Sequence, residues 1–281
     1  MKIDGREISK QILSDLKSRV ARLNEEKIIP FLAIIIVGND PASTAYVRQK
    51  ELKAKDIGIR TKILRLSDKA SQANILKIIE RLNNDNNING IIVQQPLPES
   101  IDVKKITQAI DPKKDVDGFH LNSHFEMPIN MSVLKIIEVA YLSIPNVQVR
   151  FPDWLKNKKI VIVGKGETGG KPIIQMFKAM KIPFEIIDSK TKNPENIMKK
   201  ADIIVSAVGK KNVIKAKAIK KGVILIGIGI SRKKNAELTG DYDQDKIKNI
   251  ASFYAPVPGG IGPINVAMLL KNLTKSVEDL Y

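Results

Sequence analysis

The sequence predicts an α/β fold with two domains, each built on a parallel sheet. Short apolar runs of strand length alternate with amphipathic segments of helix length from end to end. The runs are almost continuously apolar, as strands covered on both faces are. A chain of 281 residues also favours two domains over a single core.

The first domain is predicted from three apolar runs with helices between them. The strands are expected at 31–37, 63–66 and 90–93, and the helices near 5–23, 44–57 and 70–84. Asp40 followed by Pro41 indicates a helix start, because an acidic N-cap and a proline at the first helical position are both favoured there. A further helix is expected over 129–143.

The second domain is predicted from four more runs. These are 159–163, 184–187, 203–207 and 223–228. Pro145, Pro152 and polar residues place the boundary within 145–154. The last segment, 263–280, has apolar residues at helical spacing.

The composition excludes several kinds of site. Without cysteine, the chain has no disulfides, cysteine-bound zinc or thiol catalysis, and with two histidines we expect no metal site. The first residues lack the apolar stretch of a signal peptide, and no apolar run approaches the roughly 20 residues that span a bilayer. We therefore expect a cytoplasmic protein with no membrane partner.

The net charge of +17 raises the possibility of nucleic-acid binding. The excess is mostly lysine spread as doublets, and aromatic residues make up only 5%, so platforms for base stacking are not evident. A solvated lysine-rich surface is favoured, and a basic nucleic-acid-binding protein is kept as the remote alternative.

A glycine-rich turn follows the strand at 159–163 and precedes a helix. Glycines let the backbone approach a pyrophosphate, and the helix N-terminus presents free N–H groups. A purely structural tight turn is the alternative. Asp188 ends the next strand, where a carboxylate can bind the ribose hydroxyls of NAD and repels a 2′-phosphate. Lys165 and Lys190 could still neutralise that phosphate, so NADP stays open while NAD is favoured.

A second candidate site combines residues from three places in the first domain. Tyr46 and Lys50 share one face of their helix, and Gln94 stands at the carboxyl end of a strand, where open α/β sheets bind ligands. Asp117 lies in an Asp-Val-Asp-Gly turn, where it could equally be a local cap, and Asp115 is the better structural candidate.

These segments together resemble one family. They are Val37–Tyr46 with Lys50, Gly90–Pro98, Lys114–His120, the turn Gly164–Gly170 and the loop Pro256–Pro263. In this order and at these separations they resemble the bifunctional methylenetetrahydrofolate dehydrogenase/cyclohydrolase (FolD-type) family across nearly the whole chain. The resemblance implies oxidation of 5,10-methylenetetrahydrofolate with NAD(P)+ and hydrolysis of the product to 10-formyltetrahydrofolate.

The resemblance also implies an architecture and an assembly. Residues 1–143 with 264–281 would form the folate-binding catalytic domain, and 144–263 a Rossmann-like NAD(P)-binding domain. The terminal helix would return to the first domain, and the protein would form a homodimer through its nucleotide-binding domains.

The resemblance assigns roles to individual residues. Lys50 would be the acid/base group oriented by Gln94, Tyr46 would stack on the pterin and Asp117 would bind its amino-pyrimidine edge. The folate would also contact Pro258, Gly259 and Gly260. The dinucleotide would be bound by Gly164, Lys165, Gly166, Thr168, Gly169, Asp188, Ser189, Lys190 and Ile230.

Four features depart from the family pattern. They are Ile129-Asn130-Met131 after Pro128, a shortened segment 121–127, Gly227 in place of aspartate, and Asn265 in place of threonine. They lie where the folate body and the nicotinamide are expected to bind. A cyclohydrolase with impaired dehydrogenase activity is therefore the first alternative.

Overall fold

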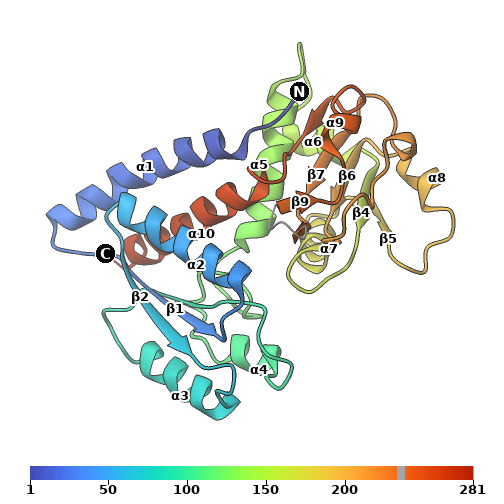
Figure 1. Cartoon of the computed structure of the whole chain (residues 1–281). Helices are drawn as coiled ribbons and strands as arrows, with labels where there is room; N and C mark the ends of the chain where they lie inside the picture. Colours follow the sequence, from blue (N-terminus) through green and yellow to red (C-terminus); the bar gives the residue numbers. More distant parts are fainter. Residues whose placement is uncertain (233–237, 281) are drawn as a thin grey trace. The chain divides into compact units, whose positions relative to one another are not determined.

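The computed structural model describes residues 1–232 and 238–280, and these form two compact units (Figure 1). Unit 1 comprises Met1–Ile8 and Ile129–Asn265, and unit 2 comprises Ser9–Pro128 and Val266–Tyr281. The functional division into 1–143 with 264–281 and 144–263 stays a prediction.

Unit 2 contains a three-stranded parallel sheet in the order β2-β1-β3. The strands are β1 (Phe31–Val37), β2 (Arg60–Leu66) and β3 (Gly90–Val93). The helices that pack in this unit are α1 (Gly5–Glu25), α2 (Pro41–Asp56), α3 (Gln72–Asn83), α4 (Val103–Gln108) and α10 (Ile261–Glu278). The pattern of the sequence did not predict α4.

The side chains of β1 divide the core of unit 2 into two layers, because successive residues of a strand face opposite ways. Leu32, Ile34 and Ile36 pack with apolar residues of α1, α2 and α10. Ala33, Ile35 and Val37 pack with α3 and α4 on the other face. The predicted return of the C-terminal helix is therefore confirmed, and α10 runs beside α1 in Figure 1.

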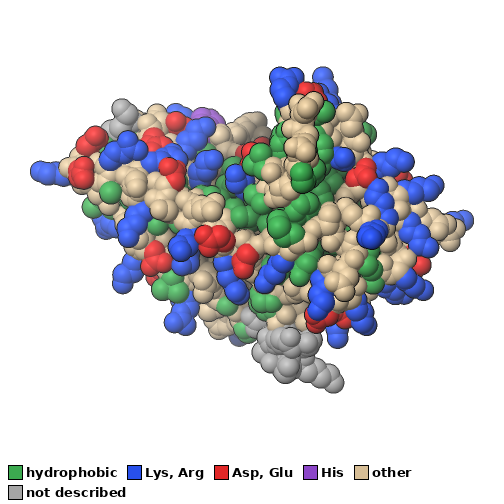
Figure 2. Space-filling model, turned by 90° about the horizontal axis from the view of Figure 1, so that it is seen from above, with side chains coloured by type: hydrophobic (Ala, Val, Ile, Leu, Met, Phe, Trp, Pro, Cys, Tyr) green, Lys and Arg blue, Asp and Glu red, His purple; other side chains and the backbone are tan. Residues whose placement is uncertain are grey.

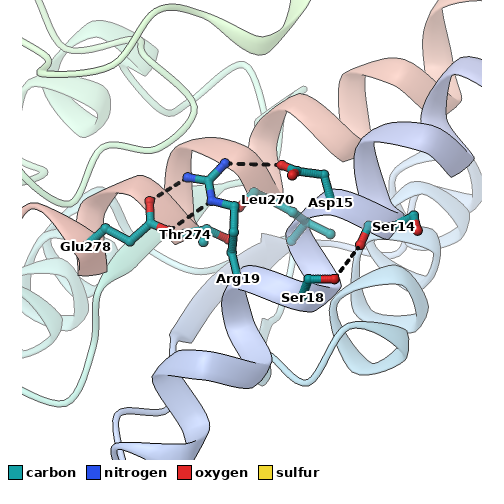
Figure 3. Close-up of polar contacts among 7 residues, drawn as sticks. All are labelled: Ser14, Asp15, Ser18, Arg19, Leu270, Thr274 and Glu278. Atoms are coloured by element: carbon teal, nitrogen blue, oxygen red, sulfur yellow. Dashed lines mark hydrogen bonds and ion pairs between the residues drawn. The ribbon is translucent and has the colours of Figure 1, made fainter.

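An arginine joins α1 to α10 (Figure 3). Arg19 donates from Nε to Glu278 Oε1 at 2.9 Å and from Nη2 to Glu278 Oε2, which is the two-pronged geometry that guanidinium and carboxylate favour. Asp15, one turn earlier on α1, lies 3.4 Å from Arg19 Nη1. The ion pair thus fixes the last turn of the chain to the first helix.

Unit 1 contains a five-stranded parallel sheet in the order β10-β7-β6-β4-β5 and a small antiparallel pair, β8 with β9. The strands are β4 (Ile160–Val163), β5 (Phe184–Ile187), β6 (Ile203–Ser206), β7 (Ile224–Gly227), β8 (Ile230–Arg232), β9 (Leu238–Gly240) and β10 (Phe253–Tyr254). The helices are α5 (Pro128–Leu142), α6 (Phe151–Lys156), α7 (Gly170–Ala179), α8 (Pro194–Met198) and α9 (Gln244–Ile247), with a 3₁₀ turn at Ala216–Ala218.

The strand order of unit 1 places a topological switch point between β4 and β6. From β4 the chain moves outward to β5, then crosses back to β6 on the other side. Open parallel sheets bind ligands outside the carboxyl ends of the strands at such a point. The turn after β4 and the segment after β6 are therefore the expected walls of a ligand site.

Basic side chains are spread over the surface. Figure 2 shows lysine and arginine side chains distributed over the visible face, with aspartate and glutamate between them. Several lysines form ion pairs with a carboxylate three or four residues away, as Lys171 does with Glu167 at 2.7 Å. On this face (Figure 2), the distribution favours a solvated surface over a nucleic-acid groove.

The helices within residues 1–232 and 238–280 include none with the length and apolar character that a membrane span needs.

The ion pair of Arg19 with Glu278 should stabilise unit 2. A double-mutant cycle with Arg19→Ala and Glu278→Ala should give a coupling free energy of about 1 kcal/mol by chemical denaturation, the upper range for partly exposed pairs. The control is the more exposed pair of Arg150, the N-cap of α6, with Asp153 in its first turn. This pair should couple by less than about 0.5 kcal/mol. Equal coupling in the two cycles would contradict this role.

Candidate active site

The structure brings together the four polar residues that the sequence suggested in unit 2. Lys50 on α2 is 2% exposed, and its Nζ donates to Gln94 Oε1 at 3.0 Å. The same Nζ lies 4.0 Å from Asp117 Oδ2 and 5.1 Å from the centre of the Tyr46 ring. Lys50 is therefore a buried lysine and not a solvated surface side chain.

Local sequence explains how α2 and β3 aim these side chains. Asp40 caps α2 by accepting from Ser43 N at 2.7 Å, and Pro41 is the first helical residue. Gln94 directly follows β3; its backbone N donates to Ile35 O at 2.8 Å and its Nε2 donates to Gln95 O at 2.7 Å. With the amide nitrogen held in this way, the oxygen Oε1 faces the lysine.

The turn that carries Asp117 is held from several sides. Asp115 is fully buried, and its Oδ2 accepts from His120 N at 2.7 Å, which closes the turn. The side chain of Lys114 donates to three backbone oxygens at the end of α3, at 2.7–3.1 Å. Asn272 on α10 donates to Val116 O at 2.9 Å. The carboxylate of Asp117 therefore sits on a rigid support.

Burial changes the protonation of two groups in this region. Removal from water lowers the pKa of Lys50, and the Asp117 carboxylate partly opposes this by raising it. Burial raises the pKa of Asp115 to about 6, with a further contribution from Asp117. Among the described residues, Asp115 Oδ1 has no hydrogen-bond partner. Lowering the pKa of a lysine makes its neutral amine more accessible, which a general acid/base requires.

In unit 1 the glycine-rich turn leads from β4 into α7. Gly164 has φ +93°, and its N donates to Ile187 O at 2.8 Å. A Cβ at Gly170 would lie 2.1 Å from Gly164 O, so only glycine allows this close approach. The side of Gly166 is open, and among the described residues no side chain caps α7 at Gly169. The turn thus leaves room and N–H groups for an anion.

Asp188 stands at the carboxyl end of β5, with both carboxylate oxygens engaged. Its Oδ2 accepts from Lys165 Nζ at 2.8 Å, and its Oδ1 accepts from Lys190 N at 2.9 Å and Thr191 Oγ1 at 3.2 Å. These bonds, with Lys165 the largest cause, lower the pKa of Asp188 to about 2. The side chain is therefore an oriented anion beside the glycine-rich turn.

The remaining predicted site residues all lie in unit 1. Thr168, Ser189 and Lys190 are exposed, and Ile230 is 50% exposed. The loop with Pro258, Gly259 and Gly260 packs against the start of α1, where Gly5 N donates to Gly259 O at 2.8 Å. A Cβ at Gly259 would lie 3.4 Å from the Arg6 guanidinium.

Two supporting residues were missed by the sequence reasoning. Asn272 interrupts the apolar face of the last helix, and that interruption was a signal available in the sequence. Asp241 is fully buried and accepts from Ser206 Oγ at 2.7 Å. It lies 35 residues away from its partner, and no local pattern indicated it.

The parallel sheet, its switch point and the glycine-rich turn define unit 1 as a dinucleotide-binding type of domain. Unit 2 adds a buried lysine with an amide and a carboxylate. Two family models match the chain: tetrahydrofolate dehydrogenase/cyclohydrolase, catalytic domain, over residues 3–117, and the NAD(P)-binding domain of the same family over residues 147–280. The chain belongs to the tetrahydrofolate dehydrogenase/cyclohydrolase family, and the predicted family and fold class are confirmed.

Individual relatives agree over their full length. The chain is 38% identical to "Bifunctional protein FolD" of Acetivibrio thermocellus over 283 residues, which covers 98% of this chain and 96% of the relative. The crystal structure of the bifunctional FolD enzyme from Campylobacter jejuni matches with a TM-score of 0.91 at 32% identity, covering 100% and 99% of the two chains. A Trypanosoma brucei FolD structure with NADP and an inhibitor matches with a TM-score of 0.89 at 28% identity, covering 100% and 98%.

The buried Asp115 should make stability depend on pH. Its folded pKa of about 6 lies above the ordinary value of 3.8, so its contribution to stability is complete below pH ~4 and is lost as pH rises through ~6. The Asp115→Asn variant has no carboxyl group to ionise, so its stability does not fall in this way as pH rises. The free energy of unfolding of the variant minus that of the parent should therefore increase by up to about 3 kcal/mol from pH 4 to pH 7, measured by chemical denaturation. A difference that stays flat would contradict the raised pKa.

Proposed function

We propose that this chain oxidises 5,10-methylenetetrahydrofolate to the methenyl cation with NAD(P)+ and then hydrolyses that cation to 10-formyltetrahydrofolate. The proposal rests above all on the buried lysine: Lys50 is 2% exposed and hydrogen-bonded to Gln94 at 3.0 Å. Membership of the tetrahydrofolate dehydrogenase/cyclohydrolase family supports the substrate class.

Lys50 is suited to handle the protons of the hydrolytic step. Water adds to the methenyl carbon, and the neutral amine of Lys50 accepts the proton that the water loses. The carbon–nitrogen bond of the ring then breaks as the hydroxyl on that carbon becomes the formyl carbonyl. The lysine returns its proton to the departing nitrogen, and the hydroxyl proton is released to water. The lowered pKa makes the neutral amine accessible, while Gln94 keeps Nζ aimed in one direction.

Asp117 and Tyr46 are suited to hold the pterin. The Asp117 side chain is 19% exposed and rigidly supported, so its carboxylate can accept from the adjacent N–H donors of an amino-pyrimidine. Tyr46 is half-buried and offers a ring face for stacking. Pro258, Gly259 and Gly260 are proposed as further folate contacts from the family resemblance.

The glycine-rich turn is suited to hold the dinucleotide. Gly166 leaves space for a pyrophosphate near the start of α7, Gly164 and Gly169 let the turn pack closely against Ala207, and Lys165 adds a positive charge. When bound, the dinucleotide accepts the hydride. Thr168, Ser189, Lys190 and Ile230 are proposed as further contacts. The ionised Asp188 at the end of β5 favours NAD, because it can bind two ribose hydroxyls and repels a 2′-phosphate.

The first alternative is a chain that has kept only the cyclohydrolase. It is motivated by Gly227, where the family often carries aspartate. A Cβ at Gly227 would lie 3.0 Å from the Tyr242 ring, so the ring already occupies that space. Parallel assays of both activities on one preparation distinguish the alternatives. Binding of oligonucleotides that neither folate nor NAD(P)+ affects would instead favour the remote alternative.

A homodimer formed through the nucleotide-binding domains and a cytoplasmic location are proposed from the family resemblance. The division of function between residues 1–143 with 264–281 and residues 144–263 is proposed on the same basis. Sedimentation of the purified chain would test the dimer.

Lys50→Met should lower the rate of methenyl hydrolysis by about 10²–10⁴-fold, the contribution of a general acid/base. Dinucleotide binding should be unchanged. Lys53→Met, at a partly exposed lysine on the same helix, is the matched control and should keep the parental rate. Hydrolysis is followed by the loss of methenyl absorbance. A Lys50→Met variant with near-parental hydrolysis would contradict the assignment of Lys50 as the general acid/base.

Asp188→Ser should shift cofactor preference towards NADP+, because the like-charge repulsion is removed while Lys165 and Lys190 remain. We expect the parent to have a lower KM for NAD+, and the ratio of kcat/KM for NADP+ to that for NAD+ to rise at least about tenfold in the variant. Glu185→Ser, at an exposed position of β5, is the control and should leave the ratio unchanged. A parent that prefers NADP+ would show that the two lysines outweigh the aspartate.

A further inference from the structure

Asp241 has a geometry that the proposed chemistry does not use. It follows β9, and it is fully buried. Its Oδ2 accepts from Ser206 Oγ at 2.7 Å and Val208 N at 3.0 Å, and its Oδ1 accepts from Lys210 N at 3.0 Å. One carboxylate thus binds three donors within five successive residues. Hydrogen bonds to an ionised acceptor are stronger than neutral ones.

The segment that Asp241 binds, residues 206–210, begins at the carboxyl end of β6 and lies directly against the glycine-rich turn. Ala207 N donates to Val163 O at 2.8 Å. A Cβ at Gly164 would lie 2.9 Å from Ala207 O, and one at Gly169 would lie 3.2 Å from Ala207 Cβ. Because β4 and β6 flank the switch point, this segment and the glycine-rich turn are its two walls.

Gly229 makes the approach of Asp241 possible. A Cβ at Gly229 would lie 2.4 Å from Asp241 Oδ2, 2.5 Å from Oδ1 and 2.3 Å from Gly209 N. No real side chain fits at such distances. Gly229 also has no left-handed φ, so alanine there is excluded by the carboxylate and the segment rather than by its own backbone.

We propose that Asp241 is a positioning residue of the dinucleotide site, whose buried carboxylate holds residues 206–210 in the shape that completes the switch point. This inference rests on the proposed dehydrogenase function. A wall held by three hydrogen bonds keeps its form before the cofactor arrives, so less ordering is required on binding. Removing the carboxylate leaves two backbone N–H groups and a hydroxyl without their acceptor, and the wall relaxes away from the turn.

A positioning role for Asp241 predicts different effects on dinucleotide binding and on hydrolysis, because the hydrolytic residues lie in unit 2 and Asp241 lies in unit 1. A purely structural role would lower both activities together with stability. A positioning role raises the KM for the dinucleotide and leaves the hydrolysis of supplied methenyltetrahydrofolate unchanged.

The experiment compares Asp241→Asn, Gly229→Ala and Ser206→Ala with the parent and with Asp243→Asn. The control residue, Asp243, accepts from Asp245 N at 3.1 Å at the start of α9 and does not bind the segment. Both activities are measured on the same preparations, NAD+ and NADP+ are each titrated by calorimetry, and thermal unfolding checks the fold.

Asp241→Asn and Gly229→Ala should each weaken dinucleotide binding by about 10- to 100-fold, the size expected for a misplaced wall. Ser206→Ala, which removes one of the three bonds, should weaken it less but in the same direction. Methenyl hydrolysis should stay within about twofold of the parent in all of them. Asp243→Asn should change neither activity.

Unchanged dinucleotide binding in Asp241→Asn or Gly229→Ala would overturn the inference, as would parallel losses of both activities. If Asp241→Asn does not fold, Gly229→Ala and Ser206→Ala decide by the same two readouts. A parent that hydrolyses the methenyl substrate but binds neither dinucleotide would reject the proposed dehydrogenase function itself. If the parent binds a dinucleotide and the variants bind it equally well, only the role of Asp241 is rejected.

Discussion

Both candidate sites depend on one constraint, which is that parallel strands bring their carboxyl ends to the same edge of a sheet. In unit 2 this edge carries Gln94 after β3 and the start of α2 after β1, so the amide of one connection meets Lys50 on the other. In unit 1 the corresponding edge of its own sheet carries the glycine-rich turn after β4 and Asp188 after β5. The chemistry of each unit is therefore assembled from residues that are distant in sequence but adjacent by topology.

Burial then sets the properties of the polar groups at these edges. Lys50, Asp115 and Asp241 are all almost completely removed from water, yet their surroundings differ. Lys50 has an amide and a carboxylate 4.0 Å away, and burial keeps its pKa lowered even though the carboxylate raises it. Asp115 has one backbone donor and a raised pKa. Asp241 has three donors and serves as a fixed acceptor. The charges and donors around each buried group thus decide whether it is suited to exchange a proton or to hold a backbone segment.

Periodicity and local motifs predicted the sheets, the strand of Gln94 and the shared face of Tyr46 and Lys50, because these features depend on neighbours within a few residues. The return of the last helix came from the family resemblance. The short helix α4 and the pair of β8 with β9 were not predicted, because elements this short contain too few residues to show a hydrophobic periodicity. Asp241 could not be predicted because its role depends on a partner segment 31–35 residues away. Asn272 was detectable only as a polar interruption in an apolar helix face.

One departure from the family pattern, the glycine at position 227, has a physical explanation. Gly227 lacks the side chain that the family often carries there, but Tyr242 places its ring atoms within 3.0–3.2 Å of where a Cβ would stand. The Tyr242 hydroxyl donates to Ala255 O, and burial raises the pKa of that hydroxyl, so the ring is held neutral in the core of unit 1. A side chain at 227 would require the Tyr242 ring to move by a few tenths of an ångström. The Tyr242 ring thus packs against the backbone of Gly227, and the missing side chain at 227 does not by itself indicate a lost activity.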